Sequence, residues 1–255
     1  MIWNDIIPYH IILLLFSSLS MAGDYTPIID QIKPNTITII GEQHKHPESI
    51  TLFRTLITDY LKQNKCLTIA LEIKSNQQAI IDQIAQGRAV AVDLEIAPMI
   101  DHPPFRKMIN GLSKLQKNGT CLKLIAIDAG NDIDLSRDEW MAVKLAEQVG
   151  ERPILVLLGS LHTLKKVHWD LSMTKDSPSV AEIMTSQGYH VKSYPQRWEN
   201  KNCDHPKHLQ SRYIKAADPE ALVLLNDSLI SLLNAFKYKT AVNVVDGIIL
   251  WECTP

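Results

Sequence analysis

The chain has 255 residues, of which 45% are hydrophobic, and it carries 26 basic and 28 acidic side chains. It is long enough to bury a full core, and its near-zero net charge gives no reason to expect nucleic acid or an anionic membrane surface as a partner. The expected partner is a small molecule or a peptide.

The first 22 residues have the features of a secretory signal peptide. Residues 11–16 form an apolar run too short to span a membrane, and Ser20 and Ala22 are small residues placed for a signal peptidase. We therefore expect an exported mature chain, periplasmic or secreted, that begins near Gly23 and has no transmembrane segment. No Cys follows the run at the expected cleavage point, so a lipoprotein anchor is not expected. Because the residues before the run include no Lys or Arg, an uncleaved anchor or a misassigned start stays an alternative.

From residue 36 onward, short apolar runs alternate with segments of helical periodicity. Residues 36–40 are continuous and β-branched, as in a buried parallel strand, and residues 47–61 carry one apolar stripe at helical spacing. The same reading predicts strands at 66–73, 121–127, 154–158, 189–194 and 247–251. It predicts the other helices at 76–86, 105–115, 137–149 and 179–186.

Strands separated by helices in this way form right-handed βαβ units. The predicted fold class is therefore α/β, with a mainly parallel sheet flanked by helices and a site at the carboxyl ends of the strands. We expect a single domain over residues 23–255. Prolines favour loops in residues 88–103, and residues 198–219 are expected to be an irregular excursion.

The four cysteines all lie in the predicted mature chain, and an even count in an exported protein fits disulfide bonds. Of the three possible pairings, we favour Cys66 with Cys121, because each opens a predicted strand. Cys203 and Cys253 would then pair within the C-terminal third. Four separately buried thiols remain the alternative.

A Gly-x-x-His pattern occurs twice, each time directly after a predicted strand. The copies run from Gly41 to His44 and from Gly159 to His162, and the strand between them in sequence ends near Glu72. The carboxyl ends of parallel strands line one edge of a sheet. We therefore expect these side chains to converge on one site.

The residue types in this cluster suit the activation of water. His44, His162 and Glu72 can ligate a divalent transition metal, and Glu42 can then act as a general base. Without a metal, the same four groups can carry out acid–base catalysis. Three further side chains are candidates for orienting a substrate or stabilising an oxyanion: Arg54, Arg137 and Ser160.

Each of these residues also has a structural interpretation. A histidine after a strand is often simply hydrogen-bonded, and Glu72 could pair with Arg54 or Arg137. Asp128, at the end of another predicted strand, is better explained as an aspartate that caps its own turn.

Four short motifs occur in a fixed order: Gly41-Glu42-Gln43-His44, Ala70-Leu71-Glu72, Arg137-Asp-Glu-Trp-Met141-Ala142, and Gly159-Ser-Leu-His162. This series resembles that of the superfamily that joins erythromycin esterases (EreA-like), ChaN-type haem-binding proteins and Tiki/TraB metalloproteases. The resemblance covers about residues 36–165. In length the chain is most similar to the ChaN-like branch.

The resemblance implies a site built from Glu42, His44, Glu72 and His162, with Arg137 in a supporting role. It implies an exported hydrolase-like protein that activates water against an ester or amide, with or without a divalent metal. The alternative is a ChaN-like protein of the cell envelope that binds haem or a related iron compound, although no tyrosine matches the haem ligand of that branch. A catalytically inactive interaction domain is a third possibility.

Overall fold

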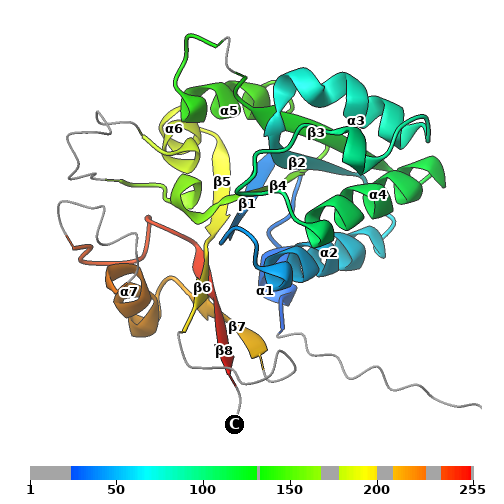
Figure 1. The fold of residues 1–255 in the computed structure, drawn as a ribbon. Helices are drawn as coiled ribbons and strands as arrows, with labels where there is room; N and C mark the ends of the chain where they lie inside the picture. Colours follow the sequence, from blue (N-terminus) through cyan, green and yellow to red (C-terminus); the bar gives the residue numbers. More distant parts are fainter. Residues whose placement is uncertain (1–23, 131–132, 168–177, 200–208, 228–236, 254–255) are drawn as a thin grey trace, which may run out of the picture.

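A computed structural model describes residues 24–130, 133–167, 178–199, 209–227 and 237–253. The predicted signal peptide and Cys203 lie outside these residues. The predicted α/β fold is confirmed, because a parallel sheet forms the centre of the molecule and helices flank it (Figure 1).

The main sheet has five strands in the order β3-β2-β4-β1-β5, and every neighbouring pair is parallel. Nearly all residues of the inner strands are buried, which explains their continuous apolar sequences. The strand bounds are β1 (Thr36–Glu42), β2 (Leu67–Lys74), β3 (Leu122–Asp128), β4 (Ile154–Gly159) and β5 (His190–Tyr194).

Helices cover both faces of this sheet, because alternate strand residues point to opposite sides. Ile40 and Leu157 pack with α2, α3 and α4, whereas Ile39 and Leu158 pack with α5 and α6 (Figure 1). The helix bounds are α1 (Thr26–Ile29), α2 (Pro47–Leu61), α3 (Gln78–Ala85), α4 (Pro103–Lys117), α5 (Arg137–Ala146), α6 (Val180–Ser186) and α7 (Pro219–Asn226). Short 3₁₀ turns are η1 (Ser75–Gln77), η2 (Ala91–Asp93) and η3 (Ser160–Thr163).

The start of α5 is fixed by local sequence. The Ser136 hydroxyl accepts a hydrogen bond from the Glu139 amide at 3.3 Å, and the Glu139 carboxylate accepts one from the Ser136 amide at 2.9 Å. This capping box satisfies amides that the first helical turn leaves unpaired. It places Arg137 and Asp138 at the carboxyl edge of the sheet.

A second, smaller sheet follows the main one, with the order β6-β8-β7. Its strands are β6 (Gln196–Trp198), β7 (Leu209–Lys215) and β8 (Gly247–Cys253), and β7 runs antiparallel to β8. The expectation of irregular structure throughout 198–219 is wrong for β7. This strand has no apolar run, because it buries only two of its residues, Ser211 and Ile214.

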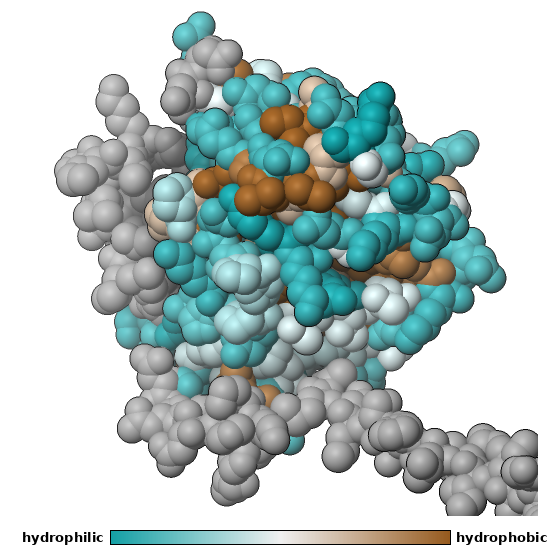
Figure 2. All heavy atoms as spheres, turned by 45° about the vertical axis from the view of Figure 1, so that its right-hand side comes forward, coloured by the Kyte–Doolittle hydropathy of each residue, from teal (hydrophilic) through white to brown (hydrophobic). Residues whose placement is uncertain are grey.

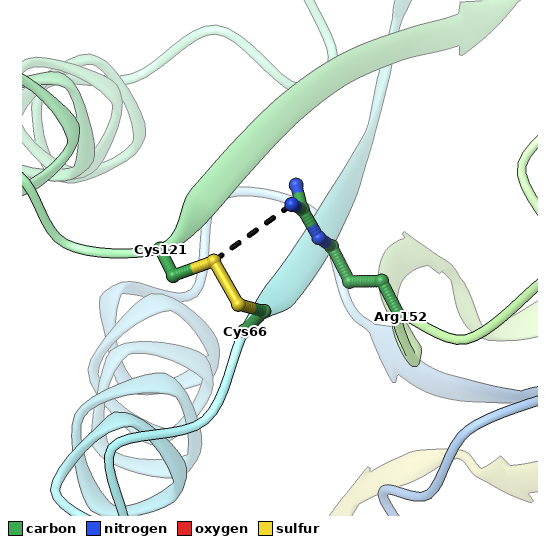
Figure 3. The surroundings of a disulfide bond; sticks show 3 residues. All are labelled: Cys66, Cys121 and Arg152. Atoms are coloured by element: carbon green, nitrogen blue, oxygen red, sulfur yellow. Dashed lines mark hydrogen bonds between the residues drawn. A yellow bond between two sulfur atoms is a disulfide. The ribbon is translucent and has the colours of Figure 1, made fainter.

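The predicted disulfide between Cys66 and Cys121 is confirmed. It joins the starts of β2 and β3, and the Arg152 guanidinium lies 3.7 Å from the Cys121 sulfur (Figure 3). Cys253 is disulfide-bonded as well, so neither Cys66, Cys121 nor Cys253 is a free thiol. Disulfides of this kind persist in oxidising compartments.

One edge strand of the main sheet is β3, and a side chain protects part of this edge. The Gln78 side chain accepts a hydrogen bond from the Ala126 amide at 2.8 Å and donates one to the Leu124 carbonyl at 3.1 Å. It thus occupies backbone groups that another strand would otherwise pair with. On the face that Figure 2 brings forward, hydrophobic residues gather in a patch in the upper half, among hydrophilic residues. None of the described helices has the length and apolar character needed to cross a membrane.

Candidate active site

The carboxyl ends of the three inner strands meet at one point. Glu42 ends β1 and pairs in register with Gly159, which ends β4. The Gly159 amide donates a 2.7 Å hydrogen bond to Glu72 Oε2 on β2. The connection after β1 covers one face of the sheet and the connection after β4 covers the other. Such a switch point is where open α/β sheets bind ligands.

The first histidine–carboxylate pair joins His44 to Glu42. His44 Nδ1 lies 2.9 Å from Glu42 Oε1, and Glu42 is almost fully buried. The hydrogen bond to Glu42 raises the pKa of His44, and the charge of Glu72 adds to this effect against the cost of burial. Gly41, within β1, permits close packing beside this pair, because a Cβ there would lie 2.8 Å from Thr163 and 2.9 Å from Pro195.

The second pair joins His162 to Asp138. His162 Nδ1 on η3 lies 2.5 Å from Asp138 Oδ1 in the first turn of α5, and the same oxygen accepts a hydrogen bond from the Val180 amide at 3.1 Å. Burial is the largest single influence on His162 and opposes a charge on it, but the hydrogen bond to Asp138 and the charges of Asp138 and Glu72 together outweigh it and raise the pKa of His162. Asp138 therefore orients this imidazole from a different element of the fold.

The two imidazoles border the same space above Gly159. A Cβ added at Gly159 would lie 3.3 Å from His44 Nε2 and 3.6 Å from His162 Cδ2. Because each Nδ1 is held by a carboxylate, each Nε2 is the nitrogen left for a ligand or for water. Glycine leaves this space open, and any other residue would fill it.

Arg137 completes the site through two carboxylates. Its Nε and Nη2 donate to the two oxygens of Asp128 at 2.7 and 2.8 Å, and Nη2 also donates to Glu72 Oε1. The Asp128 hydrogen bonds raise the pKa of Arg137, so its positive charge is fixed. Asp128 also accepts from the Ala129 amide at 2.8 Å, so it caps its own turn as predicted and holds Arg137 as well.

The other two predicted residues lie differently. The Ser160 hydroxyl donates to the backbone carbonyl of Glu42 at 3.2 Å, so it stabilises the turn that follows β1. Arg54 is exposed on α2 and lines a groove beside α4 rather than joining the two histidine–carboxylate pairs. Their roles in catalysis stay predictions.

Sequence reasoning missed Asp138 and His102. In the sequence, Asp138 is recognisable only as an acidic residue in the first turn of a helix. Its contact with His162 could not be predicted, because the two residues are 24 positions apart. His102 precedes α4, and its Nδ1 is buried with no hydrogen bond to any described residue. Burial lowers the pKa of His102, and the carboxylate of Glu42 opposes this, which places His102 within electrostatic reach of the site.

Among the residues that the structure describes, no group of three or more His, Cys, Asp or Glu side chains is arranged to hold a metal ion. In the predicted set of His44, His162 and Glu72, both oxygens of Glu72 already accept hydrogen bonds, from Arg137 and from the Gly159 amide. A metal on this set stays a prediction, and Glu72 would hold it with oxygens that also accept these hydrogen bonds.

Solved structures with the same fold cover most of this chain at low sequence identity. A Campylobacter jejuni ChaN structure, described as binding haem cofacially, is 11% identical, with a TM-score of 0.53 over 88% of this chain and 90% of that one. A Bacillus cereus protein is 10% identical, with a TM-score of 0.57 over 90% and 91%. A mutant of the erythromycin esterase EreC in its open conformation is 9% identical, with a TM-score of 0.56 over 89% and 92%. No protein-family model matches the chain, and no curated protein matches it in sequence.

Proposed function

From the fold that this chain shares with ChaN and with an erythromycin esterase, and from its two histidine–carboxylate pairs, we propose that it is an exported hydrolase-like enzyme. It activates water against an ester or amide bond. The observation that carries the proposal is the shared space above Gly159, bordered by two imidazoles whose Nδ1 atoms are both held by carboxylates.

The carboxylates define the protonation chemistry of the two rings. Glu42 accepts the Nδ1 proton of His44 and leaves the lone pair of Nε2 free to take a proton from water. His162, held by Asp138, then donates a proton from Nε2 to the leaving group. Both carboxylates raise the pKa of their histidine. In this mechanism His44 acts as the base in its neutral form, and His162 acts as the acid in its protonated form.

Arg137 supplies positive charge beside the two rings. Its Nε and Nη2 bind Asp128 and Glu72, so Nη1 is the group left to donate to a substrate oxygen. A donor held in place before the reaction stabilises the charge that develops on a carbonyl oxygen. Glu72 accepts hydrogen bonds from Arg137 and from the Gly159 amide, so it acts as a positioning residue for both, and no step of this mechanism passes through a metal.

Export rests on two observations. The sequence begins with a predicted signal peptide, and the Cys66–Cys121 disulfide favours an oxidising compartment. Expression of the full chain, followed by fractionation and amino-terminal sequencing, tests this part. A mature chain that begins near Gly23 outside the cytoplasm supports export, and an intact chain retained in the cytoplasm contradicts it.

A second candidate function is the binding of haem or a related iron compound at the cell envelope. It is favoured by the fold shared with ChaN and by His46, whose partly exposed ring lies 4.4 Å from the ring of Trp198. Trp198 in turn stacks on Trp251 at 5.8 Å. An accessible imidazole beside an aromatic wall provides an axial ligand and an apolar surface for a porphyrin.

One preparation distinguishes these functions. Purified protein is screened against chromogenic esters and amides, analysed for metals, and titrated with haemin. Hydrolysis of at least one substrate, without a Soret shift on haemin addition, supports the hydrolase. A Soret shift that His46→Ala abolishes and His190→Ala retains, in a protein that cleaves none of the substrates, supports haem binding and contradicts the hydrolase.

A further inference from the structure

A groove of about 770 Å³ lies between α2 and α4, which pack side by side on one face of the sheet (Figure 1). Arg54 contributes from α2, and the α4 residues that line the groove recur at helical spacing, from Pro103 to Lys114. A Cβ added at Gly111 would have no neighbour within 4 Å, so the floor of the groove is open there. A volume of this size accommodates a small organic molecule.

The groove carries an excess of positive charge. Arg54, Lys107 and Lys114 line it, and no described carboxylate forms an ion pair with any of them. The acidic side chain in the lining is Asp101, which already binds Arg106 through both oxygens at 2.6 and 2.8 Å. Three cations are therefore left without a described anionic partner.

One end of the groove borders the candidate active site. His102 lines the groove and directly precedes α4. Because α4 leads back to the start of β3, its amino-terminal end lies at the carboxyl edge of the sheet, where the candidate site is. The His102 Nδ1 atom is buried and has no hydrogen bond to any described residue. A ligand that occupies the groove therefore extends from the three cations to His102, toward the carboxyl edge of the sheet.

We propose that this groove binds the acidic part of the substrate, a small organic anion with two or more carboxylate or phosphate groups. Arg54, Lys107 and Lys114 neutralise these groups, because guanidinium and ammonium side chains form charge-assisted hydrogen bonds with both kinds of oxyanion. The scissile bond then lies toward His102 and the histidine–carboxylate pairs. This assignment of substrate class rests on the proposed hydrolase function.

The test measures binding rather than catalysis. Citrate and tripolyphosphate are titrated calorimetrically into the mature protein at constant ionic strength, as the carboxylate and phosphate probes. A triple variant, Arg54→Gln with Lys107→Gln and Lys114→Gln, removes the groove cations. The control variant removes the same charge at exposed sites elsewhere, with Lys33→Gln, Lys237→Gln and Lys239→Gln.

We expect the groove variant to lose about tenfold or more in affinity for at least one probe. The affinity of the control variant should change by less than about twofold, because only the groove variant loses three favourable charge contacts. The probe that binds more tightly identifies the type of acidic group. Failure of wild type to bind either probe, or an equal loss in the control, overturns the proposal.

A further variant separates this proposal from the catalytic one. His44→Ala lies outside the groove lining and should bind the probes as wild type does. If wild type and His44→Ala both bind but no substrate is hydrolysed, the groove assignment stands as a binding site and the hydrolase proposal fails. If hydrolysis is found without anion binding, the groove assignment fails alone.

Discussion

The backbone amide of Gly159 donates a 2.7 Å hydrogen bond to Glu72 Oε2, although the two residues are 87 positions apart in the chain. The other oxygen of Glu72 binds Arg137. The carboxylate that the sequence analysis offered as a metal ligand thus holds the strand ends and the arginine together. In the proposed mechanism, His44 activates water and His162 protonates the leaving group.

Replacing Glu72 should therefore cost stability as well as activity. Glu72→Gln keeps the shape but removes a buried charge that accepts two hydrogen bonds, so we expect a loss of about 2 kcal/mol in the free energy of unfolding. Urea denaturation measures it. Glu95→Gln, at an exposed ion pair with Lys74, should change stability by less than about 0.5 kcal/mol. An unchanged Glu72→Gln protein would show that the anchoring role is wrong.

The pH dependence of hydrolysis should follow the Glu42–His44 pair. The hydrogen bond to Glu42 raises the pKa of His44, and a general base acts only when neutral, so the rate should rise as pH increases through that raised pKa. Glu42→Gln removes the main cause of the shift, which lowers the pKa and makes His44 neutral at lower pH. The acidic limb of the pH–rate profile should then move to lower pH. A limb that stays in place or moves upward contradicts the assignment of His44 as the base.

Asp138 should matter for chemistry more than for binding. Asp138→Asn no longer holds the proton on Nδ1 of His162, so we expect kcat to fall by about a hundredfold or more while KM changes by less than about twofold. Steady-state kinetics give both values. The control is Asp134→Asn, an exposed aspartate in the preceding segment. Equal effects of the two variants on kcat would contradict a role of Asp138 in the reaction.

Gly159 provides the sharpest steric test. Its φ of −55° is open to any residue, so Gly159→Ala should strain the backbone little. The added methyl group would lie 3.3 Å from the His44 ring and would fill the shared space. Because displaced reacting groups lose their alignment, activity should fall at least about tenfold. Stability should change by less than about 1 kcal/mol. Gly150→Ala, where a Cβ has no neighbour within 4 Å, is the matched control. Full activity in Gly159→Ala means that no reaction occurs in this space.

The Cys66–Cys121 disulfide should stabilise the sheet through the unfolded state. It closes a segment with a sequence separation of 55, which corresponds to about 4 kcal/mol of chain entropy. The double variant Cys66→Ser with Cys121→Ser should lose stability of that order in denaturant titrations. Because the bond lies at the starts of β2 and β3, far from the strand ends that carry the site, specific activity of the folded variant should stay within about twofold of wild type. A stability equal to that of wild type would contradict the expected role of the disulfide.

The features of the fold that could be predicted were those encoded locally. The apolar runs of β1 and β4 and the capping box at Ser136 each depend on neighbouring residues, and the structure has them where the patterns indicated. Strand β7 was missed because its polar residues are paired by contacts distant in sequence, such as the 3.0 Å bond of Arg212 to Glu252. A single sequence carries no local signal for such a contact.

The candidate site divides in the same way. The two Gly-x-x-His motifs predicted the positions of His44 and His162, because the carboxyl ends of parallel strands lie along one edge of a sheet. This prediction needs no knowledge of which side chains pair over long distances in sequence. Asp138 reaches the site through a hydrogen bond between distant elements, so its residue type alone gave no signal. Arg54 was expected near the site, but it lies beside the buried stripe of α2 and therefore faces outward.

The most direct test compares the two histidine variants with a matched control on one ester or amide substrate. His44→Ala and His162→Ala should each lower kcat/KM by about a hundredfold or more, the size expected for loss of a general acid or base, while His190→Ala, an exposed histidine at the start of β5, should match wild type. If the two site histidines are not structural, the free energies of unfolding of all three variants, measured by denaturant titration, should agree within about 0.5 kcal/mol. Hydrolysis by His44→Ala and His162→Ala at the wild-type rate would contradict the account.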